Sequence, residues 1–342
     1  MIIYYVGWDI HKKTLSYCVK TMDGRIVREG TIEATRSALL VWLAEIGQPW
    51  IGAMEATLFT GWVYDFLKPH AVELKVAHPK MLKAIAASKK KNDRIDAEKI
   101  ADLLRCNLLP ECHMLDEETR ELRRVLRYRN LVVRQAVLMK NKMAGLLMEV
   151  GAQYDKKRLH GKKYFEEFLK SVEDVPDSVI SLLKLSRSNL DVFQAAQKQL
   201  VMALKSHVAL RERVERLASI PGVGEVTALT WALEIGDPRR FHSRQQMISY
   251  CGLCSAQRES AGKSQRGPIS KERNRHLQTV LIEAAKLAPR WNPELAALYA
   301  KETARGNPNR ATICVARKLA VYLLAVDRRG TSFVKTRQSK VA

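Results

Sequence analysis

Hydrophobic patterning in the first hundred residues is the feature that most constrains the fold of this chain of 342 residues. Short apolar runs built from strand-forming residue types alternate there with runs whose apolar residues recur at helical spacing. The expected strands cover residues 2–10, 15–21, 24–33, 50–57 and 72–79, and the expected helices cover 36–47, 61–70 and 92–106. Three successive strands followed by alternating helix and strand predict a mixed sheet with helices packed on it.

This element order is that of the ribonuclease H fold, in which the first and fourth strands lie side by side. From about residue 116 the strand signal disappears, and apolar residues recur every three or four positions over 122–147 and again over about 179–217. Two long amphipathic helices are therefore expected. They would form an antiparallel hairpin, a dimerising coiled coil or a plain helical subdomain.

The last hundred residues are expected to be mainly helical and basic, with a polar loop over 255–281. This divides the chain into an α/β domain at 1–115, a helical linker and oligomerisation region at 116–216, and a mainly helical domain at 217–342.

The charge of the chain predicts an acidic partner. Lys and Arg number 58 against 36 Asp and Glu, which gives a net charge of +22. Such a balance favours nucleic acid or an anionic membrane as partner. The chain has no apolar run of about 18 residues, the length that a spanning helix needs. Its start has no basic region before the apolar run, so no signal peptide is expected. Nucleic acid is therefore favoured, in a cytoplasmic, nucleoid-associated protein.

Six cysteines are scattered through the sequence, which argues against a disulfide framework. Cys251 and Cys254 have the spacing of zinc ligands, but no second pair of ligands lies near them in the sequence. Two small buried apolar residues are the favoured interpretation.

Two aspartates at the start of the expected helix 92–106 suggest a metal site. Asp93 and Asp96 are three residues apart and share one face of a helix. Two neighbouring carboxylates repel each other unless a cation lies between them. The alternative is a purely structural role, with Asp93 as the N-cap of the helix.

Two further acids end strands that the expected fold places side by side. Asp9 ends the first strand and Glu55 ends the fourth, so both can meet Asp93 and Asp96 at one edge of the sheet. Four converging carboxylates predict one or two Mg²⁺ ions, about 3.5–4 Å apart where two are bound. The basic residues beside them would hold a phosphate backbone; they are Lys89, Lys90, Lys91 and Arg94.

A glycine-rich turn and a basic loop add candidate phosphate contacts. Gly222 and Gly224 lie between two helical patterns, as in a helix-hairpin-helix whose backbone N–H groups approach phosphate. A plain turn between helices would also need glycine. The polar loop contributes Arg258, Lys263, Arg266 and Lys271. Its "AGKS" resembles the end of a P-loop, but Gln257 occupies the position of the first glycine and no strand is expected before it, which disfavours an ATPase.

These motifs together resemble a known family. "GWDIHKK", "MEAT" and "KNDRIDAEKIA" are similar to the DEDD signature of the RuvC-like domain in transposases of the insertion-sequence 110 family, in its IS1111-type branch. The Piv-type DNA invertases are relatives of that family. "SIPGVGEVTA", "MISYCGLCSAQRESAGKSQRG" and "ISKERNRHLQTVL" are similar to its C-terminal transposase domain.

The resemblance implies a recombinase in which Asp9, Glu55, Asp93 and Asp96 hold Mg²⁺ and Ser260 becomes covalently joined to DNA. A carboxylate–metal cluster can activate a serine hydroxyl that is otherwise a poor nucleophile. The resemblance also implies double-stranded donor and target DNA, a non-coding guide RNA and a homo-oligomer, dimer or tetramer, in which the serine of one subunit meets the acids of another. The residues leave open a junction-resolving nuclease without a covalent step and a non-catalytic nucleic-acid-binding protein.

Overall fold

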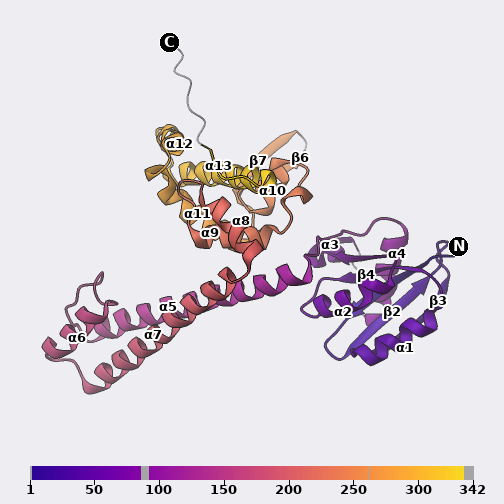
Figure 1. The fold of residues 1–342 in the computed structure, drawn as a ribbon, viewed down its shortest axis with the longest axis horizontal. Coiled ribbons are helices and arrows are strands. Elements are labelled where there is room, and N and C mark those ends of the chain that lie inside the picture. The colour runs from indigo at the N-terminus through magenta and orange to yellow at the C-terminus, as the bar shows by residue number, and fades with distance from the viewer. Residues whose placement is uncertain (1, 86–91, 261, 335–342) are drawn as a thin grey trace, which may run out of the picture. The chain divides into compact units, whose positions relative to one another are not determined.

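The computed structural model describes residues 2–85, 92–260 and 262–334. The chain divides into two compact units, Met1–Glu117 and Glu118–Ala342 (Figure 1). No helix within the described ranges is both long enough and apolar enough to cross a membrane. The boundaries expected at 115 and 216 remain predictions.

The first unit is a five-stranded mixed sheet with helices on both faces. Its elements are β1 (Tyr4–Ile10), β2 (Thr14–Lys20), β3 (Ile26–Glu33), α1 (Arg36–Ile46), β4 (Trp50–Glu55), α2 (Thr60–Leu67), η1 (Lys68–His70), β5 (Glu73–Ala77), α3 (Pro79–Ile85) and α4 (Asp93–Arg105). The strand order is β3-β2-β1-β4-β5. β1 pairs antiparallel with β2 and parallel with β4. The predicted mixed α/β sheet is confirmed, and it is consistent with a RuvC-like domain.

Alternate side chains of β1 lie on opposite faces of the sheet. Val6, Trp8 and Ile10 are buried in a core that also includes side chains of α1 and α2, such as Trp42. The opposite face carries Ala53 and Ala77 of β4 and β5, which pack with side chains of α3 and α4. Figure 1 shows these two pairs of helices on either side of the strands.

Helix α4 approaches β1 as closely as two backbones can. A Cβ atom at Gly7 would lie 2.1 Å from the carbonyl oxygen of Ala97 and 2.5 Å from the amide nitrogen of Ala101. Only glycine leaves the room that this helix occupies. A buried ion pair also holds the helix, because Lys20 of β2 donates to Glu98 at 2.9 Å and to Asp102 at 2.8 Å.

The second unit consists of helices and one β-hairpin. Its elements are α5 (Glu117–Glu149), α6 (Lys162–Ser171), α7 (Asp177–Lys205), α8 (Val208–Ala218), α9 (Glu225–Ile235), η2 (Pro238–Arg240), α10 (Arg244–Tyr250), β6 (Ser255–Ser260), β7 (Lys263–Ile269), α11 (Arg275–Leu287), η3 (Ala288–Arg290), α12 (Pro293–Thr303) and α13 (Pro308–Arg329). The long helix expected over 122–147 is confirmed as part of α5. Together with α6 and α7 it encloses one apolar cluster, and a larger cluster joins its first turns to α8–α13. The chain thus folds back on itself as a hairpin (Figure 1).

The single helix expected over about 179–217 is wrong. The chain breaks at Ser206 and His207, which cap the end of α7 and the start of α8. Apolar residues continue to recur across the break because Leu204 before it and Leu210 after it are buried in the same core.

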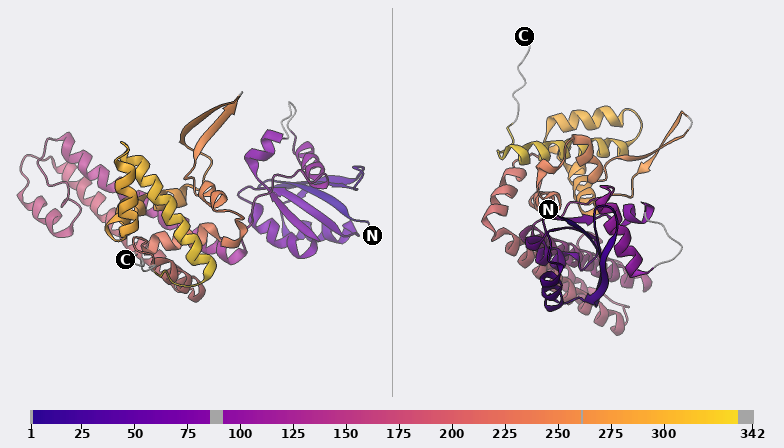
Figure 2. Two further views of the ribbon diagram at one scale, coloured as in Figure 1. Left: turned by 90° about the horizontal axis from the view of Figure 1, so that it is seen from above. Right: turned by 90° about the vertical axis from the view of Figure 1, so that its right-hand side faces the viewer.

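The polar loop expected over 255–281 is also wrong. It contains the β6–β7 hairpin and the first half of α11 (Figures 1 and 2). The side chains of Ala256, Gln257 and Glu259 in β6 are exposed. A strand without a buried face has no alternating pattern, so the sequence gives no strand signal there.

Gly7→Ala is expected to destabilise the first unit by about 1–3 kcal/mol, because the added methyl group collides with rigid helix backbone. Gly145→Ala is the matched control, since a Cβ atom there meets nothing within 4 Å. Chemical unfolding of the full chain, followed by fluorescence of the buried tryptophans, measures both. Equal stability of the two variants would contradict the close contact between α4 and β1.

Candidate active site

The four predicted acids lie on three neighbouring elements of the first unit. Asp9 is the next-to-last residue of β1 and Glu55 is the last of β4. These strands are parallel neighbours, with Trp8 opposite Met54. Asp93 and Asp96 occupy the first turn of α4, the helix that packs on β1. The structure therefore brings the four acids to one edge of the sheet.

The N-cap of α4 is Asn92, not Asp93. The side-chain oxygen of Asn92 accepts a hydrogen bond from the amide of Arg94 at 3.1 Å. The alternative explanation for an aspartate at position 93, that it caps the helix, is therefore excluded. The Asp93 side chain is 54% exposed, beside the cluster.

Asp9 is the buried centre of this cluster, with 7% of its surface exposed. Its pKa is raised from 3.8 to about 6, chiefly by burial, although His11 opposes the shift. Asp93, Asp96 and Glu55 each raise the pKa of Asp9 further, which shows that all three carboxylates lie close enough to repel it. The neighbouring carboxylates therefore make ionisation of Asp9 more costly.

His11 joins the cluster, although the sequence argument assigned it no role. Its Nδ1 atom lies 3.6 Å from Oδ2 of Asp9 and 4.0 Å from Oδ2 of Asp93. One ligand atom from each of these three residues falls within 4.8 Å of the others. Carboxylate oxygens with one imidazole nitrogen suit a divalent cation. The sequence did carry a signal for His11. Side chains of a strand alternate between its two faces, so His11, two residues beyond Asp9, falls on the same face as Asp9.

Two nearby cations are bound to acids of the same unit, one of them to an acid of the cluster itself. Lys99 lies 3.4 Å from Asp96, one turn along α4. Arg94, predicted to contact nucleic acid, donates its Nε–H to Glu29 of β3 at 2.7 Å. Lys89, Lys90 and Lys91 lie outside the described residues, so their predicted role is not tested.

Ser260 belongs to the second unit, whereas the four acids belong to the first. It is the last residue of β6 and pairs with Lys263, so it stands at the tip of the hairpin. Gly262 in the turn has φ of 75°, a left-handed conformation that glycine adopts without strain. In Figure 2 the orange hairpin projects from the helices of its own unit.

The predicted basic residues of this region follow the same hairpin. Arg258 pairs with Gln265 and Arg266 with Gln257, on opposite strands, and Lys271 lies exposed just after β7. The expectation that no strand precedes "AGKS" is wrong, because β6 leads into it. A P-loop still does not form, since β7 follows where a P-loop requires a helix.

Packing explains why one of the two positions between α8 and α9 is a glycine, but it does not explain the other. Gly222 has φ of 92°, and a Cβ atom there would lie 2.6 Å from Cα of Ala288. Packing alone therefore requires it. Gly224 is the N-cap of α9 without a side-chain cap, and a Cβ atom there meets nothing within 4 Å. Neither packing nor φ explains Gly224, which leaves its predicted phosphate contact as a hypothesis.

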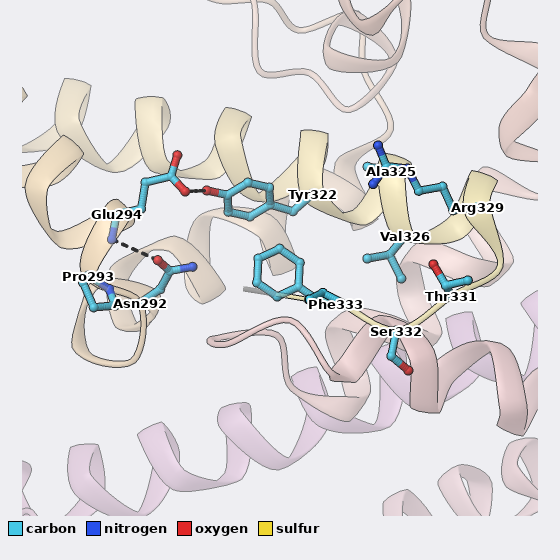
Figure 3. A pocket seen from close by; sticks show the side chains of 11 residues that line it. Asn292, Pro293, Glu294, Tyr322, Ala325, Val326, Arg329, Thr331, Ser332 and Phe333 are labelled. Carbon is cyan, nitrogen blue, oxygen red and sulfur yellow. Dashed lines mark hydrogen bonds between the residues drawn. The ribbon is translucent and has the colours of Figure 1, made fainter. Parts of the chain in front are cut away.

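Other parts of the second unit offer less chemistry. Cys251 is buried and burial raises the pKa of its thiol, as the apolar interpretation expects, whereas Cys254 is only half-buried, so the interpretation is wrong for Cys254. No zinc set involving either cysteine exists among the described residues. A cavity of about 770 Å³ lies beside α12 and α13. Three of its polar side chains are already engaged, since Asn292 accepts from the amide of Glu294 at 3.1 Å and Glu294 accepts from the Tyr322 hydroxyl (Figure 3).

Comparison with known proteins assigns the chain to a family. Residues 6–151 match a profile described as a transposase, that of the DEDD domain of IS110-type elements. Residues 214–300 match the profile of the IS116/IS110/IS902 transposase family. The chain belongs to this transposase family.

Full-length relatives agree with the assignment. The transposase for insertion sequence element IS1328 of Yersinia enterocolitica is 25% identical over 338 residues, covering 96% of this chain and 98% of the relative. The transposase for insertion sequence element IS1111A of Coxiella burnetii is 25% identical over 342 residues, covering 97% and 91%. The expected family and its similarity to IS1111-type elements are therefore confirmed.

Asp9→Asn is expected to stabilise the metal-free protein at neutral pH. The pKa of Asp9 is raised on folding, so the folded chain binds more protons between pH 3.8 and about 6, and its stability falls as pH rises through that window. The amide cannot ionise and escapes this loss. Its advantage should reach about 1–3 kcal/mol above pH 7.

Thermal unfolding in EDTA, from pH 4.5 to 8, measures that difference. Adding Mg²⁺ should raise the melting temperature of the wild type and change that of Asp9→Asn far less, because ligand binding stabilises only the form that holds the ligand. Parallel pH profiles for the two proteins would contradict the proposed electrostatics.

Proposed function

We propose that this chain cuts and rejoins the DNA strands of an insertion sequence, with the acid cluster and Ser260 as its catalytic groups. The observation that carries the proposal is the convergence of Asp9, Glu55, Asp93 and Asp96 at one sheet edge, where the other three carboxylates raise the pKa of Asp9. Membership of the transposase family supports DNA as the substrate.

The acid cluster is suited to a divalent cation, and Mg²⁺ is the ion we propose. Asp9 and Asp93 would hold it together with His11, and Glu55 and Asp96 would complete the anionic shell. When bound, such an ion polarises a phosphate and stabilises charge on its oxygens. The carboxylates would fix the position of such an ion, and the ion would in turn position the scissile phosphate.

Ser260 would then act as the nucleophile. Its hydroxyl oxygen forms a bond to phosphorus while the bond from phosphorus to a deoxyribose oxygen breaks, and the hydroxyl proton leaves to a nearby base. The sugar departs as a free hydroxyl. The phosphoserine ester keeps the energy of the broken bond, so attack by another strand's hydroxyl rejoins DNA without an external energy source. The tip of an exposed hairpin suits a group that must reach a bound phosphate.

Partners follow from the same proposal. A guide RNA paired with donor and target DNA is proposed from the family resemblance and from the net charge of +22. A homo-oligomer is proposed because α7 exposes apolar side chains that share one side of the helix; Leu182, Leu185 and Val192 are 45%, 58% and 61% exposed. Sequencing the RNA that copurifies with the chain tests the guide RNA. Light scattering of a Leu185→Glu/Val192→Glu variant tests the homo-oligomer.

Ser260→Ala is expected to abolish the covalent protein–DNA adduct, because alanine has no oxygen to attack phosphorus. Labelled substrate DNA is incubated with protein and Mg²⁺, and the label retained after denaturing electrophoresis is measured. Ser264→Ala, on the opposite strand of the hairpin, is the control that should retain the adduct. Retention by Ser260→Ala would instead favour a junction-resolving nuclease without a covalent step.

Asp93→Ala is expected to lower strand cleavage by about a hundredfold or more, since removal of an electrostatic group at a reacting phosphate typically costs that much. DNA affinity measured in EDTA should stay within about threefold of wild type, because the binding surface keeps its positive charge. Glu45→Gln on α1, away from the cluster, serves as a control for cleavage. Undiminished cleavage by Asp93→Ala would refute the acid cluster as the catalytic centre.

A further inference from the structure

Arginine side chains follow one face of the first half of α5, outside the site described above. Arg120, Arg123, Arg127, Asn130 and Arg134 recur at spacings of three and four residues, which places them on one side of the helix. We call these five residues the arginine stripe. At 1.5 Å per residue, the stripe extends over about 21 Å.

A buried acid fixes the middle of the stripe. Glu234 of α9 is fully buried and accepts two hydrogen bonds from Arg127, at 2.7 and 2.8 Å. Asn274, the N-cap of α11, donates a third at 2.8 Å. Burial alone would raise the pKa of Glu234, but Arg127 and Asn274 hold it below its ordinary value. The ionised carboxylate therefore locks α5 against α9 and α11.

The positive charge of the stripe exceeds what Glu234 can neutralise. Arg123 is partly buried, and no described residue forms a hydrogen bond or ion pair with it. Burial lowers the pKa of its guanidinium, and Arg127 lowers it further. Arg134 is exposed and likewise has no ion-pair partner among the residues described. Arg123 and Arg134 are therefore the two cations of the stripe that have no hydrogen-bonded or ion-paired partner among the described residues.

The start of α11 adds to the same positive region. His276 lies 3.5 Å from the Asn130 amide, and its neighbour Arg275 is exposed. Burial lowers the pKa of His276, and Arg127, Arg275 and Arg134 lower it further. Charges from two helices thus converge on one place.

The chemistry of this region fits phosphate groups. Guanidinium groups bind phosphate through paired N–H donors and do so more strongly where water is partly excluded. A length of about 21 Å matches about six base steps at 3.4 Å each. The stripe is also straight and rigid, because α5 is continuous and Glu234 anchors it.

We propose that the arginine stripe, with Arg275 and His276, binds the phosphodiester backbone of duplex DNA. This rests on the proposed function, which makes DNA the substrate. Its residues belong neither to the acid cluster nor to the β6–β7 hairpin, so its role is to hold the DNA rather than to act on it.

Arg123→Ala/Arg134→Ala tests the stripe, and Arg124→Ala/Lys142→Ala is the matched control. Both control residues are exposed, and they lie on another side of the same helix. Each pair removes two positive charges. Arg127 is left intact because its loss would leave Glu234 buried and unpaired. Circular dichroism verifies that all variants are folded.

Binding is measured by fluorescence anisotropy in EDTA, where no strand is cut, using a labelled DNA duplex and, separately, a labelled RNA hairpin. The stripe variant should bind the duplex about tenfold or more weakly than wild type, and the slope of log affinity against log salt should fall by about two. The control variant should stay within about twofold of wild type. A stripe variant that matches the control would overturn this inference and leave the proposed function standing.

Two further outcomes separate the possibilities. Loss of RNA affinity with unchanged affinity for the DNA duplex would overturn the assignment of the stripe to DNA. Absence of DNA binding by the wild-type chain would overturn the proposed function itself, together with the stripe.

Discussion

The contact between α4 and β1 is the constraint on which the candidate active site depends. Without a side chain at Gly7, the backbone of α4 comes within 2.1 Å of where a Cβ atom would stand, so the first turn of the helix reaches the end of β1. Lys20 then fixes the rotation of the helix, because its two acceptors, Glu98 and Asp102, lie one turn apart. With position and rotation both set, Asp93 and Asp96 have to face Asp9. The site is a consequence of packing, and its geometry does not require the acids to attract one another.

The acids in fact repel one another, and this is a cost that the fold bears. Burial and three neighbouring carboxylates raise the pKa of Asp9, so the metal-free site is held together by Gly7, Lys20 and the hydrophobic faces of the sheet rather than by its own charges. A preformed cluster of this kind binds a cation without first having to fold around it. The same repulsion makes the site a place where stability and ligand binding are linked.

Local patterns predicted most of the first unit, because four of its five strands, β1, β2, β4 and β5, contain buried residues. The position of the acids at strand ends was enough to place Asp9 beside Glu55. His11 was missed because its role depends on which face of the strand α4 covers. The β6–β7 hairpin was missed because its described side chains are exposed or half-buried and form no alternating pattern. The break at Ser206 was hidden because both flanking helices pack into one core. Hydrophobic patterns in a sequence reflect which side chains are buried, so they do not identify elements whose side chains are exposed.

Buried charges elsewhere in the chain show why the unsatisfied ones point to ligands. Lys20 and Glu234 are each fully paired, and Asp327 accepts from Arg213 at 2.7 Å and from the Trp231 indole at 2.9 Å. This chain therefore pairs a charge when its only role is structural, as desolvation demands. Two groups depart from that rule in opposite senses: three neighbouring carboxylates raise the pKa of the buried Asp9, and Arg123 and Arg134 of the arginine stripe have no ion-pair partner among the described residues. A divalent ion would satisfy the first and phosphates the second, and a DNA strand held for cleavage brings both to the protein together.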